Sequence, residues 1–282
     1  MINLNPIATI ACEKVIKEIP TSGSSPLLLL GSDMNFHFAK TCKNDTPRIE
    51  LINELVCAYL AQCWSLKVPN FSLVQIDKDV IEAFRGEAGN SLSSRYPVTL
   101  FPSIFFASKQ LNPAVELDIY FIGLKGKPAL KLFRNPTDLI KIGVFDVWIG
   151  NKDRKLENPN ILLSEVENSF DYCPIDHSAA FAYCTDYRQV TPTFMFMEEK
   201  FKILKHPMIK AIAHFGPKAK TVGLKDELLA DMELALSNID FIFDQIPASW
   251  GFSKKAKAHL KSFLSDNERN KLVADAYTNY LN

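Results

Sequence analysis

The chain has 282 residues, of which 47% are hydrophobic and 23% charged, as in soluble globular proteins and unlike disordered or fibrous chains. Its 32 Lys and Arg residues balance its 32 Asp and Glu residues, so it lacks the basic excess typical of proteins that bind nucleic acid through many phosphates. We therefore expect no direct nucleic-acid partner.

No apolar run approaches the ~18–20 residues that a membrane-spanning helix needs, and the densest one covers only residues 27–30. The N-terminus lacks a basic segment followed by an apolar stretch, so a secretory signal is not expected. The six cysteines contain no Cys-x-x-Cys spacing. We expect a cytoplasmic protein with reduced thiols and no membrane contact.

The first part of the chain has the composition of β-strands. Residues 7–19 are rich in β-branched side chains, and a turn follows at 20–26. Residues 27–30 predict a short buried strand and 36–41 a third one. Together these segments predict a small antiparallel meander over 7–41.

A helix is predicted next over residues 48–64, because its apolar side chains recur at steps of three and four. Strands are predicted at 71–76 and 101–107, with a weaker one at 120–124. The Gly, Asn and Ser residues between about 83 and 100 indicate an irregular connection.

Beyond about residue 110 the pattern is mainly helical. Helices are predicted at 137–150, 228–243, 252–264 and 270–281, and short strands at 160–163 and 172–175. We therefore predict an α+β fold of two lobes, with a β-rich N-terminal lobe over 1–110 and a helical lobe over 111–282. Such a junction commonly leaves a ligand cleft.

The polar residues that follow the helix at 137–150 have the composition of a phosphoryl-transfer site. Asp153 lies in a loop, Asn158 and Asn160 follow five and seven residues later, and Asp176 comes 23 residues on (176 − 153). Transfer from ATP needs one carboxylate to orient or deprotonate the attacking hydroxyl. It also needs an amide oxygen and a second carboxylate to hold Mg²⁺. Loop residues of these types are also common without any catalytic role.

The N-terminal half supplies the complementary parts. Lys40 ends a strand, and Glu54 lies in the next helix 14 residues later (54 − 40). A strand Lys paired with a helix Glu is how kinases direct an ammonium group at nucleotide phosphates. An upstream turn has backbone N–H groups that could cover those phosphates. This turn consists of Ser22, Gly23, Ser24 and Ser25.

In combination these motifs resemble the HipA-like protein kinases, in particular the compact members of that family. The resemblance spans most of residues 20–215. The segments that carry it are 22–26, 38–40, 53–55, 145–154, 160–163 and 175–177. It implies a bilobal protein-kinase-like fold, ATP and Mg²⁺ as cofactors, and phosphorylation of Ser or Thr hydroxyls on a protein substrate that these residues do not identify.

The resemblance also implies roles for individual residues. Asp153 corresponds to the catalytic base, Asp176 to the metal-binding Asp, Lys40 to the phosphate-contacting Lys, and Glu54 to its partner. Three uses remain open for Arg154: it braces the catalytic Asp, braces a phosphorylated loop, or forms a plain surface ion pair.

The metal-binding Asn has two candidates. Asn158 keeps the spacing of five residues from Asp153 that many kinases show, and it is slightly favoured for that reason. Asn160 directly precedes an apolar triplet, where many family members have Asn. Both residues are therefore retained as metal ligands.

Three departures from kinase patterns keep other functions open. The 22–25 loop has one Gly, His177 and Ser178 replace the Phe-Gly of ordinary kinases, and only 21 residues precede Ser22. The N-terminal subdomain of fuller family members is thus expected to be absent or supplied by another chain. The main hypothesis is a Ser/Thr kinase, with an antitoxin partner if it is the toxin of a toxin–antitoxin module. The alternatives are a nucleotide-binding pseudokinase or scaffold and a small-molecule or lipid kinase.

Overall fold

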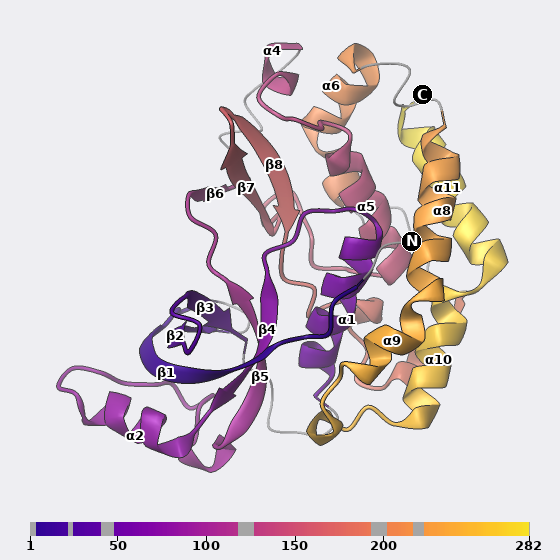
Figure 1. The fold of residues 1–282 in the computed structure, drawn as a ribbon. Coiled ribbons are helices and arrows are strands. Elements are labelled where there is room, and N and C mark those ends of the chain that lie inside the picture. Colours follow the sequence, from indigo (N-terminus) through magenta and orange to yellow (C-terminus); the bar gives the residue numbers. More distant parts are fainter. Residues whose placement is uncertain are drawn as a thin grey trace.

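The computed structural model describes the backbone of residues 4–21, 25–40, 48–117, 127–192, 202–216 and 223–281. Its strand-rich first part lies beside a group of helices from the second part, and helix α1 (Ile49–Cys63) runs between them (Figure 1). The predicted α+β organisation in two lobes is therefore confirmed. The proposed boundary near residue 110 stays a prediction.

The N-terminal strands form a closed barrel in the order β1-β2-β3-β5-β4. Its members are β1 (Thr9–Glu18), β2 (Leu27–Gly31), β3 (Phe36–Ala39), β4 (Phe71–Ile76) and β5 (Ser103–Lys109). The meander predicted over residues 7–41 corresponds to only three strands of this barrel, β1, β2 and β3. The barrel closes because β4 pairs in parallel with β1 and antiparallel with β5, a long-range pairing that local periodicity does not encode.

Helix α1 confirms the predicted helix and forms the main contact between the lobes. Nearly all of its side chains are buried, since it packs against β5 on one side and the C-terminal helices on the other. Trp64, just after its last turn, stacks on Trp148 with ring centroids 5.3 Å apart. The position of α1 is thus fixed relative to both lobes.

The predicted irregular connection between β4 and β5 is confirmed over residues 87–97, and the 3-10 turn η1 (Val98–Leu100) follows it. Helix α2 (Lys78–Gly86), which buries Ile81 and Phe84, precedes it and was not predicted. Its large apolar side chains at 80, 81 and 84 have helical spacing but span little more than one turn. Strand β5 begins after Pro102, which has no N–H to donate to a ladder.

A second sheet and the remaining helices build the C-terminal lobe. The sheet has the order β6-β7-β8, with β6 (Ala114–Glu116), β7 (Ile161–Val166) and β8 (Ser169–Pro174). The helices described here are α4 (Lys127–Leu130), α5 (Asp138–Ile149), α6 (Pro207–Phe215), α8 (Leu224–Ser237), α9 (Ile239–Asp244), α10 (Lys254–Leu264) and α11 (Asn267–Leu281). Helices α5, α10 and α11 confirm their predictions, and the predicted strand at 120–124 lies outside the described residues.

The prediction of a single helix over 228–243 is wrong, because the segment is broken into α8 and α9. Asn238 separates them with φ −102° and ψ 0°, and its side-chain amide donates to the Leu234 carbonyl at 2.8 Å. Asn often satisfies a helix end in this way at the expense of the next turn. The apolar periodicity continues across the break and hides it.

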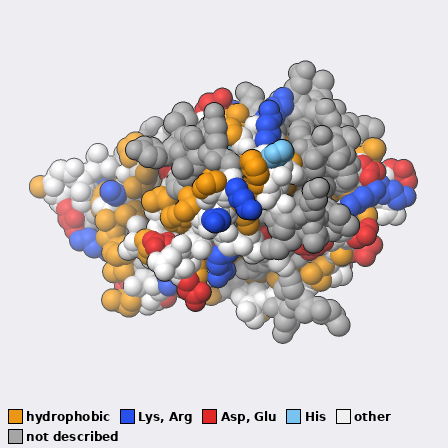
Figure 2. Space-filling view, turned by 90° about the horizontal axis from the view of Figure 1, so that it is seen from above, with side chains coloured by type: hydrophobic (Ala, Val, Ile, Leu, Met, Phe, Trp, Pro, Cys, Tyr) orange, Lys and Arg blue, Asp and Glu red, His pale blue; other side chains and the backbone are white. Residues whose placement is uncertain are grey.

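The described surface shows no single dominant chemistry. Seen from the end that carries α4 and α6, hydrophobic side chains are interspersed with Lys, Arg, Asp and Glu (Figure 2). No helix among the described residues is both long and apolar enough to cross a membrane.

Candidate active site

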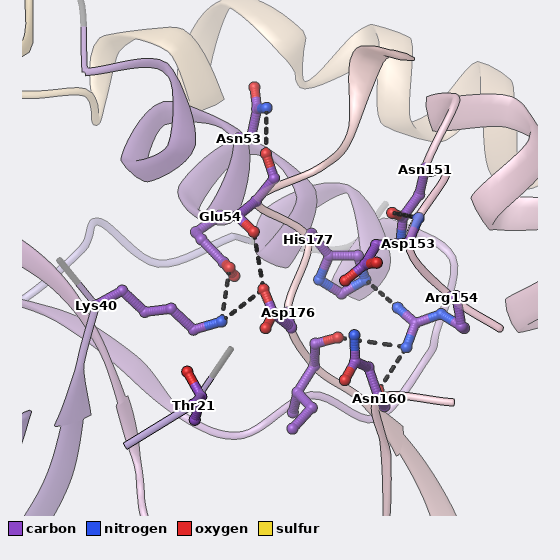
Figure 3. Close-up of polar contacts among 12 residues, drawn as sticks. Thr21, Lys40, Asn53, Glu54, Asn151, Asp153, Arg154, Asn160, Asp176 and His177 are labelled. Atoms are coloured by element: carbon purple, nitrogen blue, oxygen red, sulfur yellow. Dashed lines mark hydrogen bonds and ion pairs between the residues drawn. The ribbon is translucent and has the colours of Figure 1, made fainter. Parts of the chain in front are cut away.

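Lys40 lies at the point where β3 leaves the barrel and faces α1. Its backbone N–H donates to the Phe106 carbonyl at 2.9 Å, which continues the β3–β5 pairing by one residue. Its Nζ lies 2.9 Å from Glu54 Oε1 and 2.9 Å from Asp176 Oδ1. Figure 3 shows the three side chains converging from the barrel, from α1 and from the segment after β8.

The charges in this cluster are set by burial and by one another. Burial alone lowers the pKa of Lys40, but the Glu54 and Asp176 carboxylates outweigh it and hold that pKa above its usual range. Burial raises the pKa of Asp176, but Lys40 and a hydrogen bond from the Ser178 hydroxyl bring it well below its usual range. Lys40 and Asp176 are therefore both ionised near neutral pH. Burial raises the pKa of Glu54 above its ordinary value.

The polar loop of residues 150–160 begins at a well-defined helix end. Helix α5 stops at Gly150, which has φ 63° and so takes the left-handed conformation that glycine adopts at little cost. The Asn151 backbone N–H then donates to the Asp146 carbonyl at 2.8 Å. The end of α5 thus directs the loop toward the cluster around Asp176.

A buried guanidinium holds this loop in place. Arg154 is fully buried and pairs with the Asp146 carboxylate at 2.6 Å. It also donates to the carbonyl oxygens of Pro159 at 2.9 Å and Ile175 at 3.3 Å, and to that of Asn160. Because those acceptors belong to the loop and to the strand end before Asp176, Arg154 braces both. Its burial excludes the surface ion pair that the sequence left open.

His177 completes the support of the loop as a neutral ring. Burial lowers its pKa well below its usual range, and the charges of Arg154 and Lys40 act in the same direction. The Arg154 guanidinium lies 3.1 Å from His177 Nε2. Since Arg can only donate, Nε2 is the unprotonated nitrogen of the ring.

The other loop residues differ in exposure. The Asp153 side chain is 42% exposed, and its backbone N–H is held by the Asn151 side-chain oxygen at 3.2 Å. Asn158 is exposed, and its carbonyl accepts from the Lys155 N–H at 3.1 Å. Asn160 is half-buried, and its amide nitrogen is buried without a hydrogen-bond partner among the described residues.

A cavity of about 210 Å³ adjoins this loop. It is bordered by both candidate asparagines and by the residue that precedes Asp176, so it opens next to the metal-ligand candidates. Its remaining walls combine the carboxylates of Glu116 and Glu157 with apolar side chains. They include Leu117, Leu156, Ile161, Leu162 and Ile175.

Part of the predicted phosphate loop can be located. Ser22, Gly23 and Ser24 lie outside the described residues. Ser25 is buried, and its N–H donates to the Thr21 hydroxyl at 2.9 Å. The Tyr96 hydroxyl donates to the Ser25 carbonyl at 2.7 Å, so the start of β2 is tied to the segment that follows α2.

Of the predicted site residues, Lys40, Glu54 and Asp176 come into direct contact, and Asp153 and Asn160 lie on the adjoining braced loop (Figure 3). Sequence reasoning assigned no role to Asn53 or Asp146. Each is a polar residue in a helix whose side chains are mainly apolar, and such a residue must find a partner when it is buried. That signal could have identified both.

A strand lysine bound to a helix glutamate, together with an aspartate loop and a second aspartate at a strand end, defines the protein-kinase-like class. The sequence profile of the HipA-like kinases matches residues 12–280. The chain therefore belongs to the HipA-like kinase family, which confirms the predicted resemblance.

Solved structures of kinases are similar to the chain at low sequence identity, and the first of them supports the same fold. The Helicobacter pylori proinflammatory kinase CtkA is 15% identical, with 98% of each chain covered and a TM-score of 0.52. HipA of Shewanella oneidensis, from a complex with HipB and operator DNA, is 11% identical at a TM-score of 0.45. That match covers 94% of this chain and 66% of that chain.

A Golgi casein kinase is likewise 11% identical at a TM-score of 0.45, with 98% of this chain and 74% of that chain covered. No curated protein sequence matches the chain. Family membership supports a kinase-like function.

Proposed function

We propose that the protein is a Mg²⁺- and ATP-dependent kinase that phosphorylates Ser or Thr hydroxyls of a protein substrate. The observation that carries the proposal is the position of Lys40 Nζ, 2.9 Å from both Glu54 and Asp176. These residues come from three separate parts of the chain, and a purely structural ion pair needs only two of them. Family membership supports the same activity.

The residues present fit a nucleotide with a divalent cation. Asp176 is ionised and its side chain is 30% exposed, so it can offer a hard oxygen ligand. The amide of Asn160 is not engaged through its nitrogen, which favours it over the exposed Asn158 as the neutral ligand. When bound, ATP and Mg²⁺ supply the phosphoryl group and the charge that offsets its oxygens.

The chain's own residues would position the nucleotide and remove the proton from the attacking hydroxyl. Lys40 would bind the phosphates, with Glu54 keeping its ammonium in place. Asp176 and Asn160 would hold the cation. Asp153, on the exposed side of the braced loop, accepts the proton of the attacking hydroxyl. Arg154 keeps that loop at a fixed distance from Asp176 through the carbonyls it binds.

The test compares phosphate transfer from labelled ATP to a Ser/Thr peptide library by wild-type protein and by Asp153→Ala and Asp176→Ala. We expect each variant to lose at least about 100-fold in rate, the scale of general acid–base and charge effects. Asp240→Ala is the matched control, since that carboxylate on α9 is 77% exposed and pairs with Lys261, away from the candidate site. Wild-type rates in either site variant would contradict the assignment.

The same experiment separates the alternative functions. Thermal stabilisation of the wild-type protein by Mg²⁺ and ATP without any transfer would favour a pseudokinase or scaffold. Transfer to lipid or small-molecule acceptors but not to peptides would favour a lipid kinase or a small-molecule kinase. A toxin role, supported by family membership alone, predicts growth arrest on expression that Asp153→Ala abolishes.

A further inference from the structure

Asn53 is the neighbour of Glu54 on α1 and is completely buried. Its side-chain nitrogen donates to the carbonyl oxygens of Ser178 at 2.8 Å and Ala180 at 3.2 Å. Its side-chain oxygen accepts from the Tyr187 hydroxyl at 2.6 Å. One amide on α1 is therefore bound at three points to the chain segment that follows Asp176. Figure 3 shows Asn53 joined to the backbone of this segment.

That segment has an unusual backbone. Asp176 itself has φ 59°, and Phe181, Ala182 and Tyr183 have φ values of 54°, 64° and 60°. Left-handed backbone is unfavourable for residues with a Cβ, and consecutive residues keep it only where surrounding contacts hold them. The conformation around Asp176 therefore depends on what binds the segment from outside.

Hydrogen bonds and packing from outside the segment supply those restraints. Asn53 holds the carbonyls on the Asp176 side of the turn, and the Ala182 N–H donates to the Gly150 carbonyl at 2.9 Å on the other side. Tyr187 is buried and packs on Phe252 with ring centroids 5.2 Å apart. From α1, Asn53 holds the segment after Asp176, and the Glu54 carboxylate accepts from the His177 backbone N–H.

We propose that Asn53 is a positioning residue that holds residues 176–187 so that the Asp176 carboxylate faces Lys40. This inference rests on the proposed function, because it assigns Asp176 a role in cation binding. Since Asn53 and Glu54 are adjacent, one turn of α1 fixes both Lys40 and the Asp176 segment. A shift of α1 would move both at once.

The first test is amide hydrogen exchange of residues 177–187 in the protein without nucleotide. Asn53→Ala removes all three hydrogen bonds, and Tyr187→Phe removes one. Tyr59→Phe is the matched control, because Tyr59 is on the same helix and its hydroxyl donates to a backbone carbonyl elsewhere, that of Asn5, at 2.9 Å. We expect exchange about ten-fold faster in Asn53→Ala, a smaller increase in Tyr187→Phe, and no change in Tyr59→Phe.

Unchanged exchange in Asn53→Ala would overturn the proposal, as would an equal increase in Tyr59→Phe, which would indicate general loosening of α1. If Asn53→Ala does not fold, Tyr187→Phe decides alone. Exchange in that variant at the wild-type rate then counts against the proposal.

The second test is the Mg²⁺ concentration that gives half-maximal phosphate transfer, which a merely structural role would not move. We expect it to rise about ten-fold in Asn53→Ala, to rise less in Tyr187→Phe, and to stay unchanged in Tyr59→Phe. An active wild type whose variants keep the same Mg²⁺ requirement refutes the positioning role and leaves the kinase proposal standing. A wild type without transfer refutes the kinase proposal, while hydrogen exchange still decides whether Asn53 holds the segment.

Discussion

The buried pair between Asp146 and Arg154 makes a quantitative prediction about stability. Both side chains are at most 1% exposed, and Arg154 Nε lies 2.6 Å from Asp146 Oδ2. Asp146→Ala would leave the guanidinium buried with only neutral acceptors from the loop and from His177. Removing one partner of a buried ion pair typically costs about 3–5 kcal/mol, because the remaining charge loses its compensation.

That cost is large relative to the whole stability of a domain, which is typically about 5–15 kcal/mol. For a chain of this size each kcal/mol lowers the melting temperature by about 2–4 °C, so we expect a fall of roughly 6–20 °C. Urea unfolding at low temperature, followed by far-UV circular dichroism, gives the free energy of unfolding directly.

The matched control is Glu268→Ala, which removes an exposed pair with Lys271. Exposed pairs of this kind contribute about 0–1 kcal/mol. A free energy of unfolding that falls no further in Asp146→Ala than in Glu268→Ala would refute the reasoning. It would show that Arg154 does not depend on its carboxylate partner.

Two further predictions concern packing and pH. A Cβ added at Gly143 would collide with Leu204, whereas one at Gly86 would meet nothing within 4 Å. In thermal or urea unfolding, Gly143→Ala should therefore lower the free energy of unfolding by about 1–3 kcal/mol. Gly86→Ala should leave it unchanged or raise it by up to about 1 kcal/mol. Equal effects at the two positions would contradict the packing described. Burial lowers the pKa of His206 from 6.5 to about 4. As the pH falls, the unfolded chain therefore binds a proton at this residue before the folded chain does. The contribution of neutral His206 to stability is complete above pH 6.5 and is lost as the pH falls toward 4. His206→Asn, which keeps an acceptor for the Met208 N–H, should flatten the fall in unfolding free energy between pH 7 and 4, and an unchanged pH profile would exclude this residue as its source.

Much of the fold could be predicted because the signals are local. The apolar spacing of α1 and α5 and the glycine that ends α5 each depend on residues within one element. The barrel could not be predicted in the same way, since β4 closes it through pairing with residues far away in the chain. Helix α2 was missed because its apolar pattern spans little more than one turn. The break at Asn238 was missed because the apolar periodicity continues across it.

In the candidate site, too, some features follow from the local sequence and others depend on contacts between distant residues. Types and spacings of residues were sufficient to select Lys40, Glu54, Asp153 and Asp176. They could not show that Lys40 contacts Asp176, because that contact joins residues 136 positions apart (176 − 40). Nor could they show that Arg154 is buried, which depends on Asp146 lying one turn before the end of α5.

The closed barrel has a consequence for association with other chains. Each of its strands already pairs on both sides, in the cyclic order β1-β2-β3-β5-β4. The pairing of β1 with β4 covers only Thr9–Ala11, and the pairing of β5 with β3 covers only residues 107–109, so free main-chain groups on these two strands lie beyond those short ladders. Along the fully paired parts of the barrel, a protein that recognises this lobe contacts the side chains on its outer face, so recognition there depends on shape and residue identity.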